Sequence, residues 1–302
     1  MSGATVRTAS LPMRSILQML AAMLCFAIVD ALAKAVTTHY PANEVTFFRM
    51  IFGLVPALVL ARHATGSRSP WRPHHWRPHI ERAIALMATL GLFFAGLRHV
   101  PLGEAVALAY TETLFIILLA PLVLKEAWRR RDLLSATFGF AGILLVVRPW
   151  GEAAGAPFNL TGPVLILLSA LCGALSVIQI KRIDAADDPS LIVLYSTLIG
   201  TVVTGFSLLL AWRTPTLAHL GILVLLGVAA GTGQLLMTMA FRHADVAMLA
   251  PCNYTSIVWA TLFGYVIWGE SIGWLSFAGI ALIVGSSIAV AVRRQDTEGP
   301  VV

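Results

Sequence analysis

The chain has 302 residues, of which 58% are hydrophobic and 12% are charged, and its mean hydropathy is +0.83. A typical soluble domain carries about 25% charged residues, and a soluble core of this length leaves too much surface in water to hide so many apolar side chains. The composition therefore excludes an ordinary soluble protein, and the net charge of +6 does not indicate nucleic-acid binding, because the basic residues lie between apolar runs.

Apolar runs follow one another along the chain, and most approach the roughly 20 residues that a helix needs to cross a bilayer. They cover 15–36, 45–61, 82–97, 103–124, 133–147, 162–180, 190–211, 217–240, 246–268 and 272–292. The first run resembles a signal peptide, but we expect an uncleaved helix because further spans follow. The pattern lacks the strict alternation of barrel strands, so it predicts an all-α integral membrane protein with ten transmembrane helices.

The second half of the chain repeats the first. Tyr110-Thr111 returns as Tyr254-Thr255, and the eight residues from Phe140 return from Phe277 with six identities. Such a duplication predicts two units of five helices each. Because five is an odd number, the second unit enters the membrane from the opposite face, which predicts two inverted five-helix repeats as in many transporters. The predicted repeats cover 15–148 and 161–292.

Basic residues are divided unevenly between the two sets of predicted loops. Sixteen Lys and Arg residues fall in the loops on the side of both chain ends, and four fall in the opposite set. Loops rich in Lys and Arg stay in the cytoplasm. We therefore predict a multi-pass protein of the cell (inner) membrane with both termini cytoplasmic.

Several short motifs are spread along the chain. They are Glu44–Arg49, Ala95–Ala105, Lys125-Glu126, Phe140–Gly142 with Arg148-Pro149, Gly269-Glu270 and Phe277–Gly279. In these motifs the chain resembles the drug/metabolite transporter superfamily, specifically proteins with tandem EamA-type domains, over about 15–292.

The resemblance implies ten helices in two inverted bundles, with a central cavity lined mainly by the first, third, fourth, sixth, eighth and ninth helices. Family members move amino acids, amino-acid-derived metabolites and metal chelators, nucleotide-linked sugars, riboflavin or S-adenosylmethionine, and many bacterial members are gradient-driven exporters. The chain has no GxxxxGK[ST] phosphate loop, so we expect no ATP-hydrolysing unit within it.

Glu112 lies near the middle of the predicted span 103–124, beside the polar residues Tyr110, Thr111 and Thr113. An ionisable side chain at the bilayer centre costs at least about 2.5 kcal/mol, which makes it a functional candidate. We interpret Glu112 as a cavity carboxylate that binds a cationic group or carries a coupling proton. In the alternative it is neutral or paired and only holds helices together.

The matching stretch of the ninth predicted helix is also polar. Pro251 removes a backbone donor, while Asn253, Tyr254 and Ser256 can form hydrogen bonds in the cavity, and Ser256 occupies the repeat position of Glu112. A solute-binding site and a proline kink with polar contacts between helices both fit this pattern.

Asp30 and Lys34 lie one turn apart on the first predicted helix, which favours an i,i+4 salt bridge between them. In the alternative, Asp30 faces the transport path, because it lies well within the span. Arg49, at the outer end of the second span, is explained by snorkelling to the interface. Because Arg49 belongs to one of the family motifs, a role in a gate or in helix packing is also open. We assign Lys34 and Pro251 to the same gate or packing role.

Gln179 and Gln234 are uncharged candidates for hydrogen bonds to a solute. Trp259 can stack on a flat solute, although Trp in a helix bundle more often belongs to the core. The His-rich segment Trp71–His79 lacks the fixed spacing of zinc ligands. We therefore predict no metal site, no cofactor and no catalytic residue.

These features predict a secondary transporter that exports a small polar amino-acid-derived metabolite, an amino acid or a metal-chelating opine-like compound, by alternating access. The alternative is an importer of a vitamin or nucleoside-like metabolite such as riboflavin or S-adenosylmethionine. An integral membrane enzyme would need a nucleophile, metal set or acid–base pair, of which the sequence offers only His99 with Glu104, so no enzymatic activity is predicted. The expected partners are a small-molecule solute and the lipid bilayer, and a coupling proton is possible. We expect a monomer or a homodimer, and no binding of nucleic acid.

Overall fold

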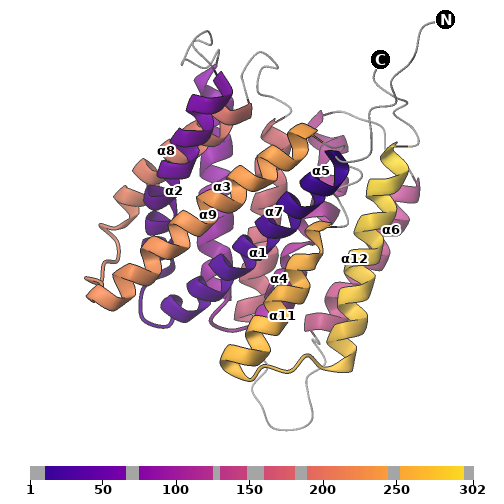
Figure 1. Cartoon of the computed structure of the whole chain (residues 1–302). Helices are drawn as coiled ribbons and strands as arrows, with labels where there is room; N and C mark the ends of the chain where they lie inside the picture. The colour runs from indigo at the N-terminus through magenta and orange to yellow at the C-terminus, as the bar shows by residue number, and fades with distance from the viewer. Residues whose placement is uncertain are drawn as a thin grey trace, which may run out of the picture.

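The computed structural model describes residues 11–65, 75–124, 130–147, 160–180, 189–243 and 252–295. These residues form helices and no strand, which confirms the predicted all-α fold. The helices, labelled as in Figure 1, are α1 (Leu11–Thr37), α2 (Ala42–Thr65), α3 (Trp76–Gly96), α4 (Leu102–Ala109), α5 (Glu112–Leu124), α6 (Arg130–Val147), α7 (Thr161–Ile180), α8 (Pro189–Ser207), α9 (Leu217–His243), α11 (Thr255–Trp268) and α12 (Trp274–Gln295).

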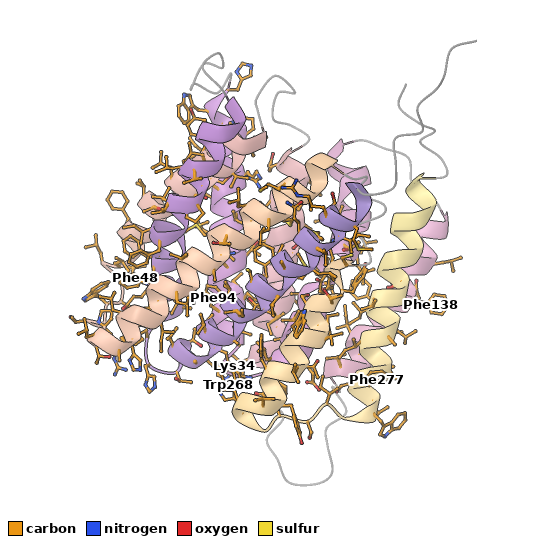
Figure 2. The ribbon with its side chains drawn as sticks, in the orientation of Figure 1. Lys34, Phe48, Phe94, Phe138, Trp268 and Phe277 are labelled. Atoms are coloured by element: carbon orange, nitrogen blue, oxygen red, sulfur yellow. The ribbon has the colours of Figure 1, made fainter. Side chains whose placement is uncertain are left out.

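The helices have the length and the outer surface of membrane spans. Within the described residues, five stretches are long and apolar enough to cross a bilayer, namely Met13–Thr37, Ala42–Val59, Trp76–Gly96, Thr161–Gln179 and Leu217–Met237. Large apolar side chains stay exposed on the outside, among them Phe206 at 71% and Phe277 at 69%, and Figure 2 shows Phe138 and Phe277 pointing away from the bundle. Such a surface suits lipid and not water, so the chain is a multi-pass membrane protein; the count of ten spans stays a prediction.

One end of the bundle gathers helix ends from both halves of the chain. Arg98, just after α3, donates a hydrogen bond to the carbonyl of Tyr40, just after α1. A Cβ on Gly162, at the start of α7, would lie 2.6 Å from the Cβ of His99. Since α1 ends and α7 begins at the same end, the two helices run in opposite directions, as Figure 1 shows. We call this end, opposite to Leu11 and Gln295, the sealed end.

Helix contacts in the two halves correspond to one another. The contact of α1 with α9 matches that of α7 with α3, and α2 with α8, α4 with α11 and α6 with α12 pair across the halves. The contact between α6 and α12 is reciprocal: a Cβ on Gly142 would lie 2.7 Å from the carbonyl oxygen of Gly279, and a Cβ on Gly279 would lie 2.6 Å from that of Gly142. Only glycine permits this approach of the two backbones. Together with the opposite directions of α1 and α7, these pairings describe two inverted repeats.

The predicted span 103–124 is not one continuous helix. It is broken at Tyr110 and Thr111, where α4 ends and α5 begins. The backbone tightens there, because the amide of Thr111 bonds to the carbonyl of Leu108 at 3.0 Å, and the hydroxyl of Thr111 donates to the same carbonyl at 2.7 Å. A threonine hydroxyl that competes for a backbone carbonyl disturbs the regular helical ladder.

The same break occurs in the second repeat. Tyr254 lies in a turn directly before α11, although the sequence predicts a helix across 246–268. The hydroxyl of Thr255 donates to the carbonyl of Cys252 at 2.6 Å, which copies the bond of Thr111. Tyr110 and Tyr254 keep right-handed helical backbone angles. The repeated Tyr-Thr pair therefore marks a local tightening of the helix, called a helix break below, in both halves.

The apolar core lies towards the sealed end. Its largest cluster includes Phe94 and Leu97 near the end of α3, Val100 in the following loop, and Leu102 at the start of α4, all at most 5% exposed. Val36 near the end of α1 belongs to the same cluster. These side chains close the bundle at this end, while a smaller cluster around Met19 and Ala240 lies nearer the chain ends.

Candidate functional site

A cavity of about 420 Å³ lies in the middle of the bundle. Its walls come from α1, α2, α3, α4, α5, α7, α9 and α11, so both repeats contribute. The polar and charged side chains that line it are Asp30, Arg49, Thr89, Tyr110, Glu112, Thr113, Ser169, Gln234 and Ser256. Its volume is within the range of small-molecule sites, which is roughly 300–1,000 Å³.

Glu112 lines the cavity directly after the helix break, as the first residue of α5. The carboxylate lies against α7, since a Cβ on Gly173 would come within 2.5 Å of its Oε2 atom. Glycine at position 173 therefore provides the space that the carboxylate occupies.

Asp30 and Arg49 face the cavity from α1 and α2 and interact electrostatically. The Nε atom of Arg49 is buried and has no hydrogen-bond partner. The snorkelling interpretation of Arg49 is therefore wrong, because its side chain points into the protein and not towards the membrane interface. Leaving a buried donor without a hydrogen bond costs free energy, and a solute with an acceptor group can supply the missing bond.

The predicted salt bridge between Asp30 and Lys34 is also wrong. Lys34 forms an ion pair with Glu270, 236 residues away, and donates to the carbonyl of Val100 at 2.8 Å. The other carboxylate oxygen of Glu270 accepts a hydrogen bond of 2.8 Å from the backbone amide of Leu102. The ring centroid of Trp268 lies 5.4 Å from the Lys34 ammonium. These contacts outweigh the local i,i+4 arrangement, because Glu270 neutralises Lys34 while Arg49 faces Asp30.

The Lys34–Glu270 cluster ties three parts of the sealed end together: the end of α1, the start of α4, and the segment between α11 and α12. Figure 2 shows Lys34 beside Trp268 at this end. A second group of contacts lies nearby, where Tyr40 bonds to His219 at 2.8 Å and Glu44 accepts from the amide of Arg213 at 2.9 Å. Both groups join elements of the two repeats.

The two helix breaks meet at Tyr110. Its hydroxyl donates to the carbonyl of Asn253 and lies 2.7 Å from the hydroxyl of Ser256. The rings of Tyr110 and Tyr254 are 5.1 Å apart. Tyr110 and Ser256 therefore line the cavity, whereas Asn253 and Tyr254 contribute to the contact that holds the breaks together.

The remaining candidates lie elsewhere. Neither Gln179 nor Trp259 is among the residues that line the cavity, and the Trp259 ring stacks on Phe263 at 6.5 Å. Lys34 lies at the sealed end, and Pro251 lies outside the described residues. Among the residues that the structure describes, no three His, Cys, Asp or Glu side chains gather as metal ligands.

Sequence reasoning missed two important side chains. Arg82 is one of the sixteen basic residues of the charge count although it is also the first residue of the predicted span 82–97; in the structure it lies inside the bundle and donates hydrogen bonds to Ser196 and to the carbonyl of Ile192. The sequence places Glu270 only in the Gly269-Glu270 motif and assigns it no role. The available signals were Arg82 at the first residue of the predicted span 82–97, and the recurrence of an acid two residues after the fourth and ninth predicted spans, at Glu126 and Glu270.

Inverted repeats and a charged interior cavity are typical of secondary transporters. The chain belongs to the EamA-like transporter family, which it matches over residues 13–148 and 160–292.

Two relatives and one solved structure illustrate the similarity. The pseudopaline exporter CntI of Pseudomonas aeruginosa is 28% identical over 275 residues, which cover 89% of this chain and 93% of the relative. A riboflavin transporter of Rhizobium johnstonii is 26% identical and covers 91% of this chain and 89% of its own length. A crystal structure with a TM-score of 0.61 and 20% identity covers 94% of this chain and 99% of its own, and it supports the fold alone.

Proposed function

We propose that the protein is a secondary transporter of the inner membrane that exports a small zwitterionic, amino-acid-derived metabolite by alternating access. The observation that carries this proposal is the charge pattern of the cavity, where the carboxylates of Asp30 and Glu112 and the guanidinium of Arg49 line one space. A solute with an amine and a carboxylate complements both signs of charge. Two unit charges about 4 Å apart attract by roughly 4 kcal/mol at the effective dielectric constant of a protein surface, so each such contact favours the zwitterion over a neutral analogue.

One relative supports the proposed direction of transport. The similar protein of Pseudomonas aeruginosa is named as an exporter of pseudopaline. The cavity walls from α1, α3, α4 with α5, α7, α9 and α11 are the helices that the family resemblance implies for a solute site, and α2 adds Arg49. No enzymatic step is part of the proposed function.

The sealed end supports alternating access. With the cytoplasmic orientation of both chain ends that the basic loops favour, the Lys34–Glu270 cluster and the apolar cluster close the outer side, and the cavity faces the cytoplasm. The inverted repeats, which we propose to consist of five spans each over 15–148 and 161–292, provide equivalent contacts for closing the inner side in the opposite state. Glu112 is the proposed site for a coupling proton, because it is an acid in the cavity at the first turn of α5.

The second candidate function is import of a flat vitamin or nucleoside-like compound. Phe26, Phe93 and Tyr110 line the cavity and offer aromatic surface for stacking, and one relative is named as a riboflavin transporter. This candidate does not explain why two carboxylates and a guanidinium surround the same space. We therefore favour the zwitterion.

The test is counterflow in sealed vesicles that contain only the purified protein. Vesicles loaded with a mixture of unlabelled amino acids and N-carboxyalkyl amino acids should accumulate a labelled member of this set, while riboflavin should not compete. Asp30→Asn and Glu112→Gln should each lower uptake at least tenfold. Glu112→Gln should also remove the dependence of uptake on a pH gradient. The matched control is Glu81→Gln, because Glu81 pairs with Arg77 at the start of α3, away from the sealed end, and neither residue lines the cavity.

Two results would contradict the proposal. If riboflavin competes and zwitterions do not, the second candidate is correct. If both cavity variants transport the identified solute at the wild-type rate, the charges of the cavity do not bind it.

A further inference from the structure

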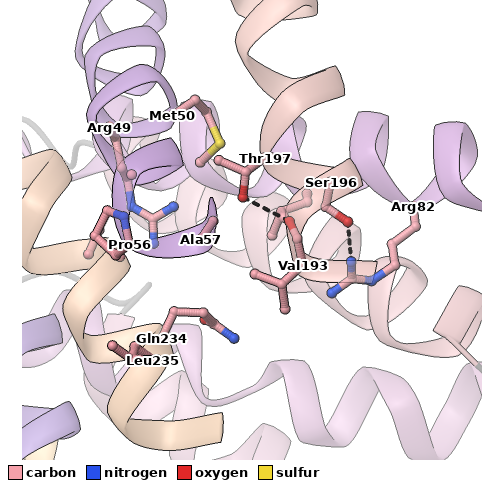
Figure 3. Close-up of a pocket in the computed structure, with 14 residues that line it drawn as sticks. Arg49, Met50, Pro56, Ala57, Arg82, Val193, Ser196, Thr197, Gln234 and Leu235 are labelled. Carbon is pink, nitrogen blue, oxygen red and sulfur yellow. Dashed lines mark hydrogen bonds between the residues drawn. The ribbon is translucent and has the colours of Figure 1, made fainter. Parts of the chain in front are cut away.

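A second pocket, which we call the side pocket, lies beside the cavity between α2, α3, α8 and α9 (Figure 3). Its volume is about 130 Å³, enough for several water-sized groups. Arg49 and Gln234 line both spaces, so these two side chains form the boundary between the side pocket and the cavity.

Two guanidinium groups face the side pocket, and none of the described residues that line it carries a carboxylate. Arg49 comes from α2 and Arg82 from α3, and Figure 3 shows both groups pointing into the space from opposite sides. Among the described residues, Asp30 interacts with Arg49 on the cavity side, but Arg82 has only uncharged partners, the hydroxyl of Ser196 and the carbonyl of Ile192.

Both arginines also have an N–H group that forms no hydrogen bond with the described residues. The Nε atoms of Arg49 and Arg82 are buried without hydrogen-bond partners. The hydroxyls of Ser196 and Thr197 donate to carbonyls of their own helix, at 2.6 and 2.9 Å, and therefore do not neutralise the charge. Positive charge with unused N–H donors in a closed space is the arrangement that binds carboxylates and phosphates.

Small residues create the room for such a group. Gly53, Ala57, Ala230 and Gly231 line the walls between the arginines. At Gly53 the nearest atom to an added Cβ is the carbonyl oxygen of Gly227 at 3.6 Å, whereas a Cβ on Gly231 would lie 2.6 Å from Pro56, so Gly231 lets α9 pack on α2 and Gly53 leaves space beside the pocket. The space is a recess of the protein interior next to the proposed solute site.

We propose that the side pocket binds a second carboxylate of the transported solute, and that Arg82 makes the transporter selective for an amine that carries two or more carboxylates. The inference rests on the proposed function. The amine lies between Asp30 and Glu112, one carboxylate binds Arg49 at the boundary, and the second enters the side pocket and binds Arg82. A simple amino acid leaves Arg82 without a counter-ion and therefore binds more weakly.

The experiment measures binding to the full-length protein in detergent by titration calorimetry with three probes: glycine, iminodiacetate and inorganic phosphate. Glycine has one carboxylate and iminodiacetate has two on one amine. We expect iminodiacetate to bind at least tenfold more tightly than glycine. Arg82→Gln should bring the two affinities within about twofold of each other by weakening iminodiacetate alone.

A control variant tests the effect of losing a positive charge elsewhere on the same helix. Arg77→Gln changes an exposed arginine of α3, and we expect no change with any probe. If Arg82 only holds α3 against α8, Arg82→Gln leaves the affinity ratio of the probes unchanged, and the proposal is overturned.

The wild-type protein provides a test even if Arg82→Gln does not fold. Equal affinities for glycine and iminodiacetate, together with zwitterion counterflow in vesicles, overturn the second-carboxylate site while the proposed function stands. Tighter binding of phosphate than of iminodiacetate assigns the pocket to another anion and also overturns the inference. Absence of both zwitterion binding and counterflow overturns the proposed function as well.

Discussion

The Lys34–Glu270 pair allows a quantitative prediction about the sealed end. Lys34 and Glu270 are 9% and 20% exposed. Breaking a buried ion pair costs about 3–5 kcal/mol. Because Glu270 is partly exposed and keeps its bond to Leu102, we take about 2 kcal/mol for Lys34→Met. Both side chains are hydrated once this end opens, so the loss falls on the closed state alone. A shift of about 2 kcal/mol raises the open fraction roughly 30-fold.

The assay is cysteine labelling on a background without the three native cysteines. Phe93→Cys places a thiol at a position that belongs to the apolar cluster of the sealed end and also lines the cavity. A membrane-impermeant maleimide added outside intact cells should label this thiol roughly 30 times faster when Lys34→Met is present. Glu270→Gln should act in the same direction, and the double variant should add little to either single change.

The reasoning fails if Lys34→Met changes the labelling rate by less than about twofold. In that case the apolar cluster alone keeps the end closed. Arg77→Gln, at the other end of the bundle, is the matched control for the loss of one positive charge and should leave the rate unchanged.

Three further substitutions test the cavity walls and the helix end beside the pair. Gly173→Ala should lower transport at least tenfold, because its Cβ would lie 2.5 Å from Oε2 of Glu112, while Gly221→Ala, with no atom within 4 Å of its Cβ, should transport normally. Tyr110→Phe loses the hydrogen bonds between the two helix breaks and should lower the free energy of unfolding by about 1–3 kcal/mol, measured by thermal unfolding in detergent. Gly269 has φ +67°, so Gly269→Ala should cost about 1 kcal/mol in the same measurement, and an unchanged melting temperature would show that this turn adapts.

Hydropathy was sufficient to predict the helices. Each apolar run of the sequence overlaps at least one described helix, and for α7 the prediction 162–180 differs from Thr161–Ile180 by one residue. This agreement follows from the bilayer, which forces every backbone amide and carbonyl within a span to bond inside its own helix. Length and apolar composition are therefore nearly enough to locate a span.

The helix break before Glu112 could not be predicted in this way. The residues around Tyr110 and Thr111 include no proline or glycine within four positions, so the local sequence favours a continuous helix. The break depends on a threonine hydroxyl bond and on the contact of Tyr110 with the other repeat. The recurrence of Tyr-Thr in both halves was the only sequence signal, and it indicated a repeat without indicating a break.

The sequence also could not predict which charged residues pair, because the partners lie far apart along the chain. The sequence places Lys34 one turn from Asp30, and only the fold brings it to Glu270. Arg82 illustrates the same limit, since a charge count assigns it to a loop while the helix carries it inside. Local spacing predicts which side chains can meet on one helix, but it contains no information on contacts between helices.

The charges of the cavity and the side pocket are unevenly distributed between the two repeats. Asp30, Arg49, Arg82 and Glu112 all belong to the first repeat, whereas the second lines both spaces with uncharged polar groups such as Gln234. The first-repeat charges nevertheless lie on different packing groups, because α1 and α2 pack on α9 while α3 and α5 pack on α7. A solute held by Arg49 and Glu112 together links these groups, and a ligand shifts a conformational equilibrium only through contacts that differ between states. In the function that we propose, duplication provides equivalent surfaces for closing either end, and the uneven placement of the charges allows one oriented solute to contact both packing groups.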